Sequence, residues 1–576
     1  MVRHGKSVAR CRIALRALFV AVLLSPCAGE AETPVSGIDP TTILPKAVKP
    51  APSLSPPSDQ KAESDDDAAL RFQLSTVQFT GAHALDEDAL RQTWASMAGQ
   101  MVSIADLRTI ARRAEALYAR HGYGFVVVVV APQKVEGGVV RFDVIEGRIS
   151  DLTVLGSDPA ARKQATAAFA PVLGQSPPTA ASLEAAFENA QAVPGLAVDG
   201  ALRRGSGTGG LDLVVHAKRE EWRTYANVNN LYPSAVGPFG ILFGVDHIGR
   251  SLYGNQTSFQ AYRSIGPGVQ SILRLSHAHG LDASGTKLSV TLFAAWANPF
   301  DSRTKVDFAT NVKAGRLALS HPLISRFGGN LSVTAALDVS NQTTRVFGAT
   351  TLSVDKLRIA SLSLDGEWRP AMGGHATGSI QIRQGLDILG ASKSNDPRLS
   401  RPNANPKATI ANISIEYETP SFRKMRFDWR VEGQLASDAL LQPEQYTIGN
   451  LSIGRGYQPG ANYGDNALAV ASELRFGPFN SPLHSRIEPF MFYDFAKLWT
   501  ISPGAHQERY IDAAGAGLRL ELPNKWHVEL SYAVPLRAPL GLGEPVPHGR
   551  FLLNLTVGLN GLFKALHHPV SAGAKL

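Results

Sequence analysis

Residues 222–563 consist of short segments in which apolar and polar side chains alternate, and this pattern limits the fold more than any other feature. Residues 526–532 are typical, because Trp, Val, Leu and Tyr occupy the even positions and His527, Glu529 and Ser531 lie between them. A period of two places the apolar side chains on one face of a β-strand. Gly, Asn, Asp and Pro separate the segments, and helical periodicity nearly disappears. The span is therefore predicted to be all β.

The polar face of these segments carries full charges in one strand after another. In a transmembrane barrel, lipid contacts the apolar face and a wet lumen contacts the polar face. At about 21 residues for each strand and its connection, the span allows about 16 strands. We therefore expect residues 221–563 to form a transmembrane antiparallel β-barrel, with a soluble β-sandwich or β-helix as the alternative.

Residues 1–28 have the features of a secretory signal peptide, with five Lys and Arg residues, no Asp or Glu, and a mostly apolar run at 13–24. This run is too short to span a bilayer. Both cysteines, Cys11 and Cys27, lie in this segment, so we expect an exported chain without a disulfide framework. Without residues 1–28 the formal net charge falls from +8 to +3, which removes the main reason to expect nucleic-acid binding.

Two α/β units are predicted between the signal peptide and the barrel. Residues 29–70 read as a Pro-rich linker that buries no core. In residues 71–148 we expect a strand at 72–80, helices at 86–96 and from Ser103, and strands at 125–131 and 139–146. In residues 149–220 we expect a strand at 149–155, helices at 159–173 and 179–192, and strands at 196–203 and 211–218. The order β-α-α-β-β thus occurs twice, and we expect two α+β domains, then the barrel and a tail at 564–576.

This organisation resembles the two-partner secretion transporters of the haemolysin and filamentous-haemagglutinin type, which have two POTRA domains before a barrel. In the first unit, Gly122-Tyr123, Pro132-Gln133 and Glu146-Gly147 resemble, in order and spacing, the signature of the family's first POTRA domain. In the barrel, Gly454-Arg455-Gly456-Tyr457 resembles the motif at the tip of a long loop that folds back into the lumen. Phe492 and Asp494 resemble a strand motif that follows this loop in the family.

Arg455 and Asp494 are expected to meet in the lumen. Two glycines flank Arg455, which indicates close backbone approach in a confined space, and a guanidinium there suits a carboxylate partner. Asp494 shares the strand parity of Phe490 and Phe492, and it should face the lumen because charge on the lipid face is costly. The alternative is that the two act independently, with Arg455 as a turn arginine facing water. A partly hydrated pair would contribute about 0–1 kcal/mol to stability.

The resemblance implies an outer-membrane pore of a Gram-negative bacterium that recognises one large exported partner protein through periplasmic POTRA domains. Translocation to the cell surface or the medium would proceed without nucleotide hydrolysis. The expected partners are that protein, outer-membrane lipid and the barrel-assembly machinery during biogenesis. We expect no enzymatic activity, no cofactor, no metal site and no nucleic-acid partner. An assembly or insertion factor of the same superfamily and a passive porin or receptor are the alternatives.

Overall fold

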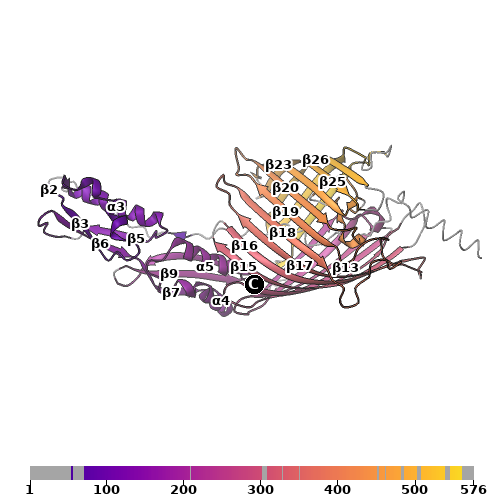
Figure 1. Ribbon diagram of the computed structural model, residues 1–576, viewed down its shortest axis with the longest axis horizontal. Helices are drawn as coiled ribbons and strands as arrows, with labels where there is room; N and C mark the ends of the chain where they lie inside the picture. The colour runs from indigo at the N-terminus through magenta and orange to yellow at the C-terminus, as the bar shows by residue number, and fades with distance from the viewer. Residues whose placement is uncertain are drawn as a thin grey trace, which may run out of the picture.

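The computed structural model describes residues 54–55 and 71–560, apart from short gaps at 131, 208, 267, 301–307, 327–328, 349, 450–452, 461, 482–484, 502–506 and 539–544. Figure 1 shows two small α/β units in a row at one end of a large barrel. The predicted signal peptide (1–28) and tail (564–576) lie outside the described residues, as does the predicted linker (29–70) except for residues 54–55.

The first α/β unit is a three-stranded sheet packed against one long helix. Its elements are β2 (Arg71–Gln73), β3 (Thr76–Thr80), α2 (Glu87–Arg91), β4 (Met101–Ser103), α3 (Ile104–Arg120), β5 (Val126–Val130) and β6 (Val139–Glu146). The sheet has the order β3-β6-β5, with β3 parallel and β5 antiparallel to β6. Helix α3 begins after Ser103 as predicted, because Ser103 and Asp106 form a capping box. Its buried side chains, Ile110 and Tyr118 among them, form one core with the sheet.

The second unit repeats this arrangement with two helices against its sheet. Its elements are β7 (Arg148–Leu155), α4 (Pro159–Phe169), α5 (Ala180–Ala192), β8 (Leu196–Arg204) and β9 (Gly210–Arg219). The sheet order is β8-β9-β7, and β1 (Leu54–Ser55) adds a parallel strand at the edge of β8. Part of the predicted linker therefore belongs to this sheet. No helix in the described part of the chain combines the length and the apolar character needed to cross a membrane.

Most of the remaining strands form a closed antiparallel barrel, and the described residues supply 16 long strands. The strands are β10 (Trp222–Asn229), β11 (Phe239–Ile248), β12 (Asn255–Ile265), β13 (Val269–Gly280), β14 (Lys287–Asn298), β15 (Phe308–Arg326), β16 (Gly329–Val346), β17 (Thr350–Trp368), β18 (His375–Gly385), β19 (Thr409–Glu418), β20 (Met425–Ala436), β23 (Asn466–Phe476), β25 (Arg486–Trp499), β26 (Glu508–Leu522), β27 (Trp526–Pro535) and β28 (Arg550–Gly558). A two-residue strand, β24 (Phe479–Asn480), also pairs with β25. The predicted fold and strand number are confirmed.

The barrel wall is uneven in height around its circumference. Strands β10 and β28, which close the barrel, have 8 and 9 residues, whereas β15 and β17 have 19 each. Because β10 follows directly from the second α/β unit, the end of the barrel where β10 begins faces that unit. The long connections 386–408 and 437–465 join strands at the opposite, outer end.

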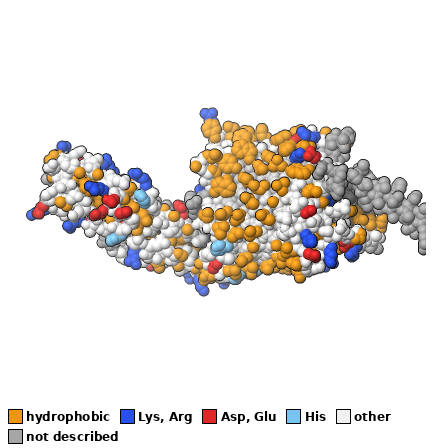
Figure 2. All heavy atoms as spheres, viewed as in Figure 1, with side chains coloured by type: hydrophobic (Ala, Val, Ile, Leu, Met, Phe, Trp, Pro, Cys, Tyr) orange, Lys and Arg blue, Asp and Glu red, His pale blue; other side chains and the backbone are white. Residues whose placement is uncertain are grey.

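The outer surface of the barrel is apolar, as the alternation predicts. In Figure 2, hydrophobic side chains cover most of the visible barrel wall. On β19, Ile413 and Ile415 are each 42% exposed, and Phe427 and Trp429 of β20 are exposed to a similar extent. A monomeric soluble protein rarely exposes so large an apolar surface, whereas a barrel in lipid requires one.

The inside of the barrel differs from the uniformly wet lumen that the charges suggest. Near the closing strands, Tyr225, Tyr262, Phe490 and Phe492 belong to one buried apolar cluster. Tyr262 also stacks on Tyr232, with ring centres 4.1 Å apart. Many charged side chains gather on β19–β27. Phe490 and Phe492 of β25 lie among them, so the aromatic cluster and the ionic groups meet at this strand.

Candidate functional site

A long hairpin, residues 437–465 between β20 and β23, folds from the outer end of the barrel into the lumen. A short ladder between β21 (Tyr446–Thr447) and β22 (Tyr463–Gly464) joins its two arms. Ile453 and Tyr457 near its tip pack with small residues on the inward face of β23, β25 and β26. The hairpin thus carries the Gly454-Arg455-Gly456-Tyr457 motif into the barrel.

Arg455 at the tip of the hairpin binds Asp494 of β25 with both its backbone and its side chain. The backbone N–H donates to Asp494 Oδ2 at 3.1 Å, and Nε donates to the same oxygen at 3.0 Å. Nη2 donates to Asp494 Oδ1 at 2.8 Å, which completes a two-pronged ion pair. The structure therefore brings together the two residues that the sequence pairs.

The Arg455–Asp494 pair is buried, so the expectation of a partly hydrated pair is wrong. Arg455 is 2% exposed and Asp494 has no exposed surface. The guanidinium carbon lies 3.4 Å from the centre of the Phe492 ring, which covers one face of the cation. Packing of the hairpin against the wall excludes solvent from both groups. A buried pair of this kind adds little net stability, but losing one partner is costly.

Glu473 of β23 is a third member of this site, and its contact with Arg455 was not predicted from the sequence. Its Oε2 accepts from Arg455 Nη1 at 2.8 Å, and its Oε1 accepts from Arg475 Nε at 2.8 Å. Arg519 of β26 binds the same carboxylate. In the barrel register Glu473 lies directly opposite Phe492, on the inward face. This contact depends on β23 and β25 being neighbours in the barrel, and the sequence alone does not show which strands are neighbours.

The remaining motif residues fix the conformation of the hairpin tip. Gly454 has a φ of +74°, and a Cβ there would lie 2.6 Å from Ile448 Cδ1, so a β-branched residue would not fit this backbone. A Cβ on Gly456 would lie 2.8 Å from the Pro535 backbone nitrogen. The Tyr457 hydroxyl lies 2.8 Å from the carbonyl oxygen of Asp512. The tip therefore fits closely against the ends of β26 and β27.

In the first α/β unit, Glu146 is the centre of the predicted signature. Its Oε1 accepts from the backbone N–H groups of His83 and Ala84, both at 2.8 Å, and from the Tyr118 hydroxyl at 2.9 Å. Burial, together with the hydrogen bond to Glu146, raises the pKa of Tyr118 well above its ordinary value. Glu146 thereby holds the turn after β3 against helix α3.

The other signature residues shape the turns of this unit and its joint with the next. Gly122 ends α3 and accepts a 3.0 Å bond from the backbone N–H of Ala180 in the second unit. Tyr123 packs edge-on against Tyr118. Pro132 is exposed, and Gln133 extends the sheet by bonding to both the N–H and the carbonyl of Arg141. Gly147 separates β6 from β7.

The residues around Glu146 and the residues around Arg455 form two separate sites. The Glu146 set shapes the units outside the barrel, whereas the Arg455 set fixes a segment within the lumen. Within the described ranges, no group of three or more His, Cys, Asp or Glu side chains is placed to hold a metal ion. The Arg455 set can therefore hold the lumen hairpin against the barrel wall.

The second α/β unit is attached to the barrel through Arg219, a residue that sequence reasoning missed. Its side chain is 1% exposed, and its Nε donates to Asp158 Oδ2 at 2.8 Å. Its Nη1 donates to the carbonyl of Ile248, at the end of β11, at 2.7 Å. The hydrogen bond from Arg219 lowers the pKa of Asp158, which also caps helix α4. Arg219 therefore joins the α4 terminus to the inner rim of the barrel.

A cleft of about 420 Å³ lies between the two α/β units. The first unit contributes His83 and Tyr123 to its lining, and the second contributes Ser176, Pro177 and their neighbours. The eight lining residues include no Lys, Arg, Asp or Glu. The cleft is therefore polar and aromatic without carrying a fixed charge.

Family models match both parts of the chain. Residues 72–147 match the model of the POTRA domain, ShlB-type. Residues 305–522 match the model of the haemolysin secretion/activation protein ShlB/FhaC/HecB. The second match includes the hairpin, Arg455, Glu473 and Asp494.

Individual proteins extend this similarity over most of the chain. The heme/hemopexin transporter protein HuxB of Haemophilus influenzae is 22% identical over 492 residues, which covers 81% of this chain and 84% of HuxB. The structure of CdiB from Escherichia coli superimposes with a TM-score of 0.69 at 18% identity, covering 88% of this chain and 94% of CdiB. BamA from Haemophilus ducreyi lacking POTRA domains 1–3 gives 0.50 at 14% identity, with 85% of this chain and all of that one covered.

Proposed function

Because the chain belongs to the haemolysin secretion/activation family of ShlB, FhaC and HecB, the two-partner secretion transporters, we propose that it exports one large partner protein. The partner is recognised in the periplasm by the POTRA region and passes through the barrel to the cell surface or the medium. The observation that carries this proposal is the combination of a POTRA region, a 16-strand barrel and a lumen hairpin that charged groups hold in place.

The barrel spans the outer membrane, and the POTRA region lies in the periplasm. The apolar outer wall contacts lipid, and the connections 386–408 and 437–465 lie at the cell-surface end. Transport requires no nucleotide, because binding in the periplasm and folding of the partner outside the cell supply the driving force. Neither nucleic acid nor a catalytic step has a place in this scheme.

We infer that an extended, uncharged segment of the partner binds in the cleft between the two POTRA units. A strand of the partner could instead add to a sheet edge, but the edges of β5 and β8 are already partly occupied. The Val128 N–H at the free edge of β5 already donates to Glu115 Oε1 at 3.0 Å, and β1 pairs with β8 at Gly200 and Ala201. The cleft offers hydrogen-bonding and aromatic groups without a charge that would select a charged segment.

The lumen hairpin acts as the gate of the pore in this proposal. In the closed state the ion pairs of Arg455 hold its tip against the wall. A partner chain that enters the lumen displaces the tip from the buried apolar cluster that it forms with β23, β25 and β26. A passive porin would not need the POTRA region, and an assembly factor would insert other barrels instead of exporting a soluble partner.

Secretion of a large exported protein encoded beside the gene for this chain tests the proposal. Deleting residues 71–220 should stop secretion, while the barrel still fractionates with outer membranes and conducts ions in planar bilayers. A photo-crosslinking residue at Ser176 should capture the partner during export, whereas the same residue at the exposed Thr166 on α4 should not. Normal secretion from the truncated chain would overturn the proposal.

A further inference from the structure

A second segment occupies the outer mouth of the barrel beside the hairpin. The connection 386–408 between β18 and β19 lies along the upper part of β17, which extends beyond its pairing with β18. The backbone N–H of Val354 donates to the carbonyl of Arg398 at 2.7 Å, and that of Ser392 donates to the carbonyl of Lys356 at 2.9 Å. These bonds fasten loop 386–408 to the barrel wall and cover an otherwise open strand edge.

Loop 386–408 is also bound to the base of the hairpin by an ion pair. Arg401 Nη1 lies 2.5 Å from Asp465 Oδ1, and Nη2 lies 3.3 Å from Oδ2. Asp465 has no exposed surface and Arg401 is largely buried. The same Nη1 donates to the carbonyl of Leu440 at 2.6 Å, so Arg401 contacts both arms of the hairpin.

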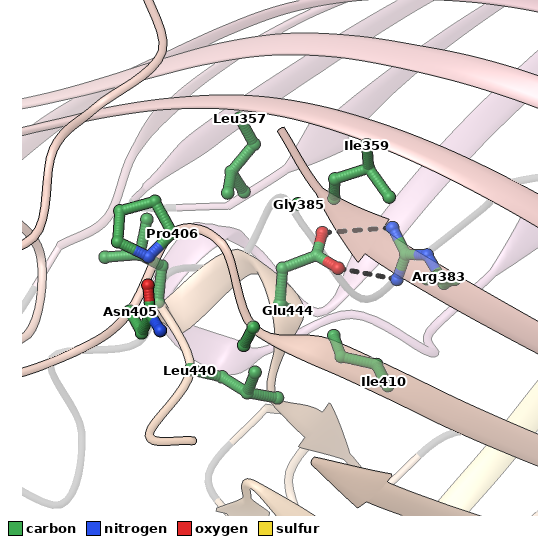
Figure 3. A pocket seen from close by; sticks show the side chains of 11 residues that line it. Leu357, Ile359, Arg383, Gly385, Asn405, Pro406, Ile410, Leu440 and Glu444 are labelled. Carbon is green, nitrogen blue, oxygen red and sulfur yellow. Dashed lines mark hydrogen bonds and ion pairs between the residues drawn. The ribbon is translucent and has the colours of Figure 1, made fainter. Parts of the chain in front are cut away.

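Strand β18 supplies another contact to the same part of the hairpin. Figure 3 shows Arg383 of β18 and Glu444 of the hairpin facing each other as a two-pronged pair. Their closest approach is 2.6 Å, between Arg383 Nη1 and Glu444 Oε2. The small cavity beside them, lined in part by Leu357 and Leu440, has a volume of about 10 Å³, enough for about one water molecule. The contact is therefore closely packed.

We propose that loop 386–408 and the base of the hairpin form one plug that narrows the outer mouth of the pore, with Arg401–Asp465 as its main fastening. This plug rests on the proposed transport function, in which the lumen must be closed when no partner is present. It acts separately from Arg455, because it holds the hairpin at its base and Arg455 holds the tip.

The contacts of Asp465 predict a graded effect of substitution. Besides Arg401, this carboxylate accepts from the backbone N–H groups of Leu440 and Ile501, at 3.1 and 2.6 Å, and from Gln445 Nε2 at 3.1 Å. Removing Arg401 leaves the other three donors bound to Asp465. Removing Asp465 leaves all of them without their acceptor, so Asp465→Ala should open the plug further than Arg401→Ala.

Single-channel conductance of the full-length protein in planar bilayers, with KCl as the permeating salt, tests the plug. We expect a gain of about two-fold or more for Arg401→Ala and a larger gain for Asp465→Ala, because conductance follows the narrowest hydrated section of a pore. Arg486→Ala is the matched control, since it breaks a 2.9 Å ion pair to Glu521 at the periplasmic ends of β25 and β26. Its conductance should equal that of the parent.

A reversible crosslink provides the decisive comparison. Asn405 and Ala439 are adjacent, because the Asn405 N–H donates to the Ala439 carbonyl at 2.8 Å. In Arg401→Ala with Asn405→Cys and Ala439→Cys, oxidation should return the conductance to the parental value and reduction should raise it again. Heat-modifiable migration on gels reports that each variant is folded.

The plug proposal would be overturned if folded Asp465→Ala had the same conductance as the parent. It would also be overturned if oxidation of the crosslinked Arg401→Ala variant left its conductance unchanged. Because conductance needs no partner protein, this result is distinguishable from a failure of the transport function, which secretion assays measure.

Discussion

Arg455 and Arg519 bind the same carboxylate, although one lies in the lumen hairpin and the other in the barrel wall. Glu473 Oε2 lies 2.8 Å from Arg455 Nη1 and 3.2 Å from Arg519 Nη2. Arg519 also donates to Glu529 of β27 at 3.0 Å. Through alternating charges the hairpin tip is tied to β23, β26 and β27 as well as to Asp494 on β25.

Removing either member of the Arg455–Asp494 pair should release the hairpin tip. A buried charge without its partner costs about 3–5 kcal/mol, so Arg455→Ala and Asp494→Ala should each lower secretion and the thermal midpoint of heat-modifiable migration. The double variant should be no worse than the more damaging single variant, because the contact is already lost. Additive losses would show that the two residues act separately. Arg486→Ala, which breaks an exposed pair, serves as the control.

Arg455→Lys should be only partly functional, although it preserves the charge. An ammonium group cannot bond to both oxygens of Asp494 and to Glu473 with the planar geometry of a guanidinium, nor stack as well on Phe492. We expect secretion between the levels of the parent and Arg455→Ala, measured at equal amounts of barrel in the outer membrane. Full activity of Arg455→Lys would mean that charge alone holds the tip.

Glu146→Ala should loosen the first POTRA unit without affecting the barrel. The substitution removes the acceptor for two backbone N–H groups and for the Tyr118 hydroxyl. Tyr118 is buried, and an unpaired buried donor costs about 1–3 kcal/mol, whereas the N–H of the exposed His83 can bond to water. Limited proteolysis of the full-length protein should show faster cleavage within residues 71–148. Tyr118→Phe, which spares both backbone bonds, should have a smaller effect, and substitution of the exposed Glu136 by Ala should have none.

Arg219→Gln should loosen the attachment of the second POTRA unit to the barrel. The variant loses the ion pair with Asp158 and part of the bonding to the Ile248 carbonyl. Proteolysis near residues 219–222 should become faster, while heat-modifiable migration stays unchanged. Equal protection in the parent and the variant would contradict this role for Arg219.

The attachment through Arg219 should also depend on pH in the parent. Because the pKa of Asp158 is lowered in the folded protein, its contribution is present above the ordinary value of 3.8 and is lost as the pH falls below it. Protection of residues 219–222 should therefore decrease at acidic pH in the parent. Arg219→Gln should show little further change over the same range.

The alternation along a strand predicts which side chains face the lumen, and this part of the site could be predicted from the sequence. The sequence does not show which strands lie side by side, so contacts between strands could not be predicted. The inward direction of Asp494 follows from its parity with Phe490 and Phe492. The role of Glu473 depends on β23 and β25 lying side by side in register. Arg401 and Asp465 are 64 residues apart, and no local pattern links them. The buried aromatic cluster was not predicted, because charged residues on the inward face of the strands indicate a wet lumen throughout.

The uneven barrel wall determines where an exported chain meets the cell surface. A tilted strand needs about 9–11 residues to cross the hydrocarbon core, so the 8 and 9 residues of β10 and β28 barely reach across it. We expect the bilayer to thin beside this low rim. On the opposite side of the barrel, residues 350–358 of β17 extend beyond the last residue pair with β18, so the wall is higher there. We expect a polypeptide that leaves beside β10 and β28 to meet the bilayer surface sooner than one that leaves beside β17.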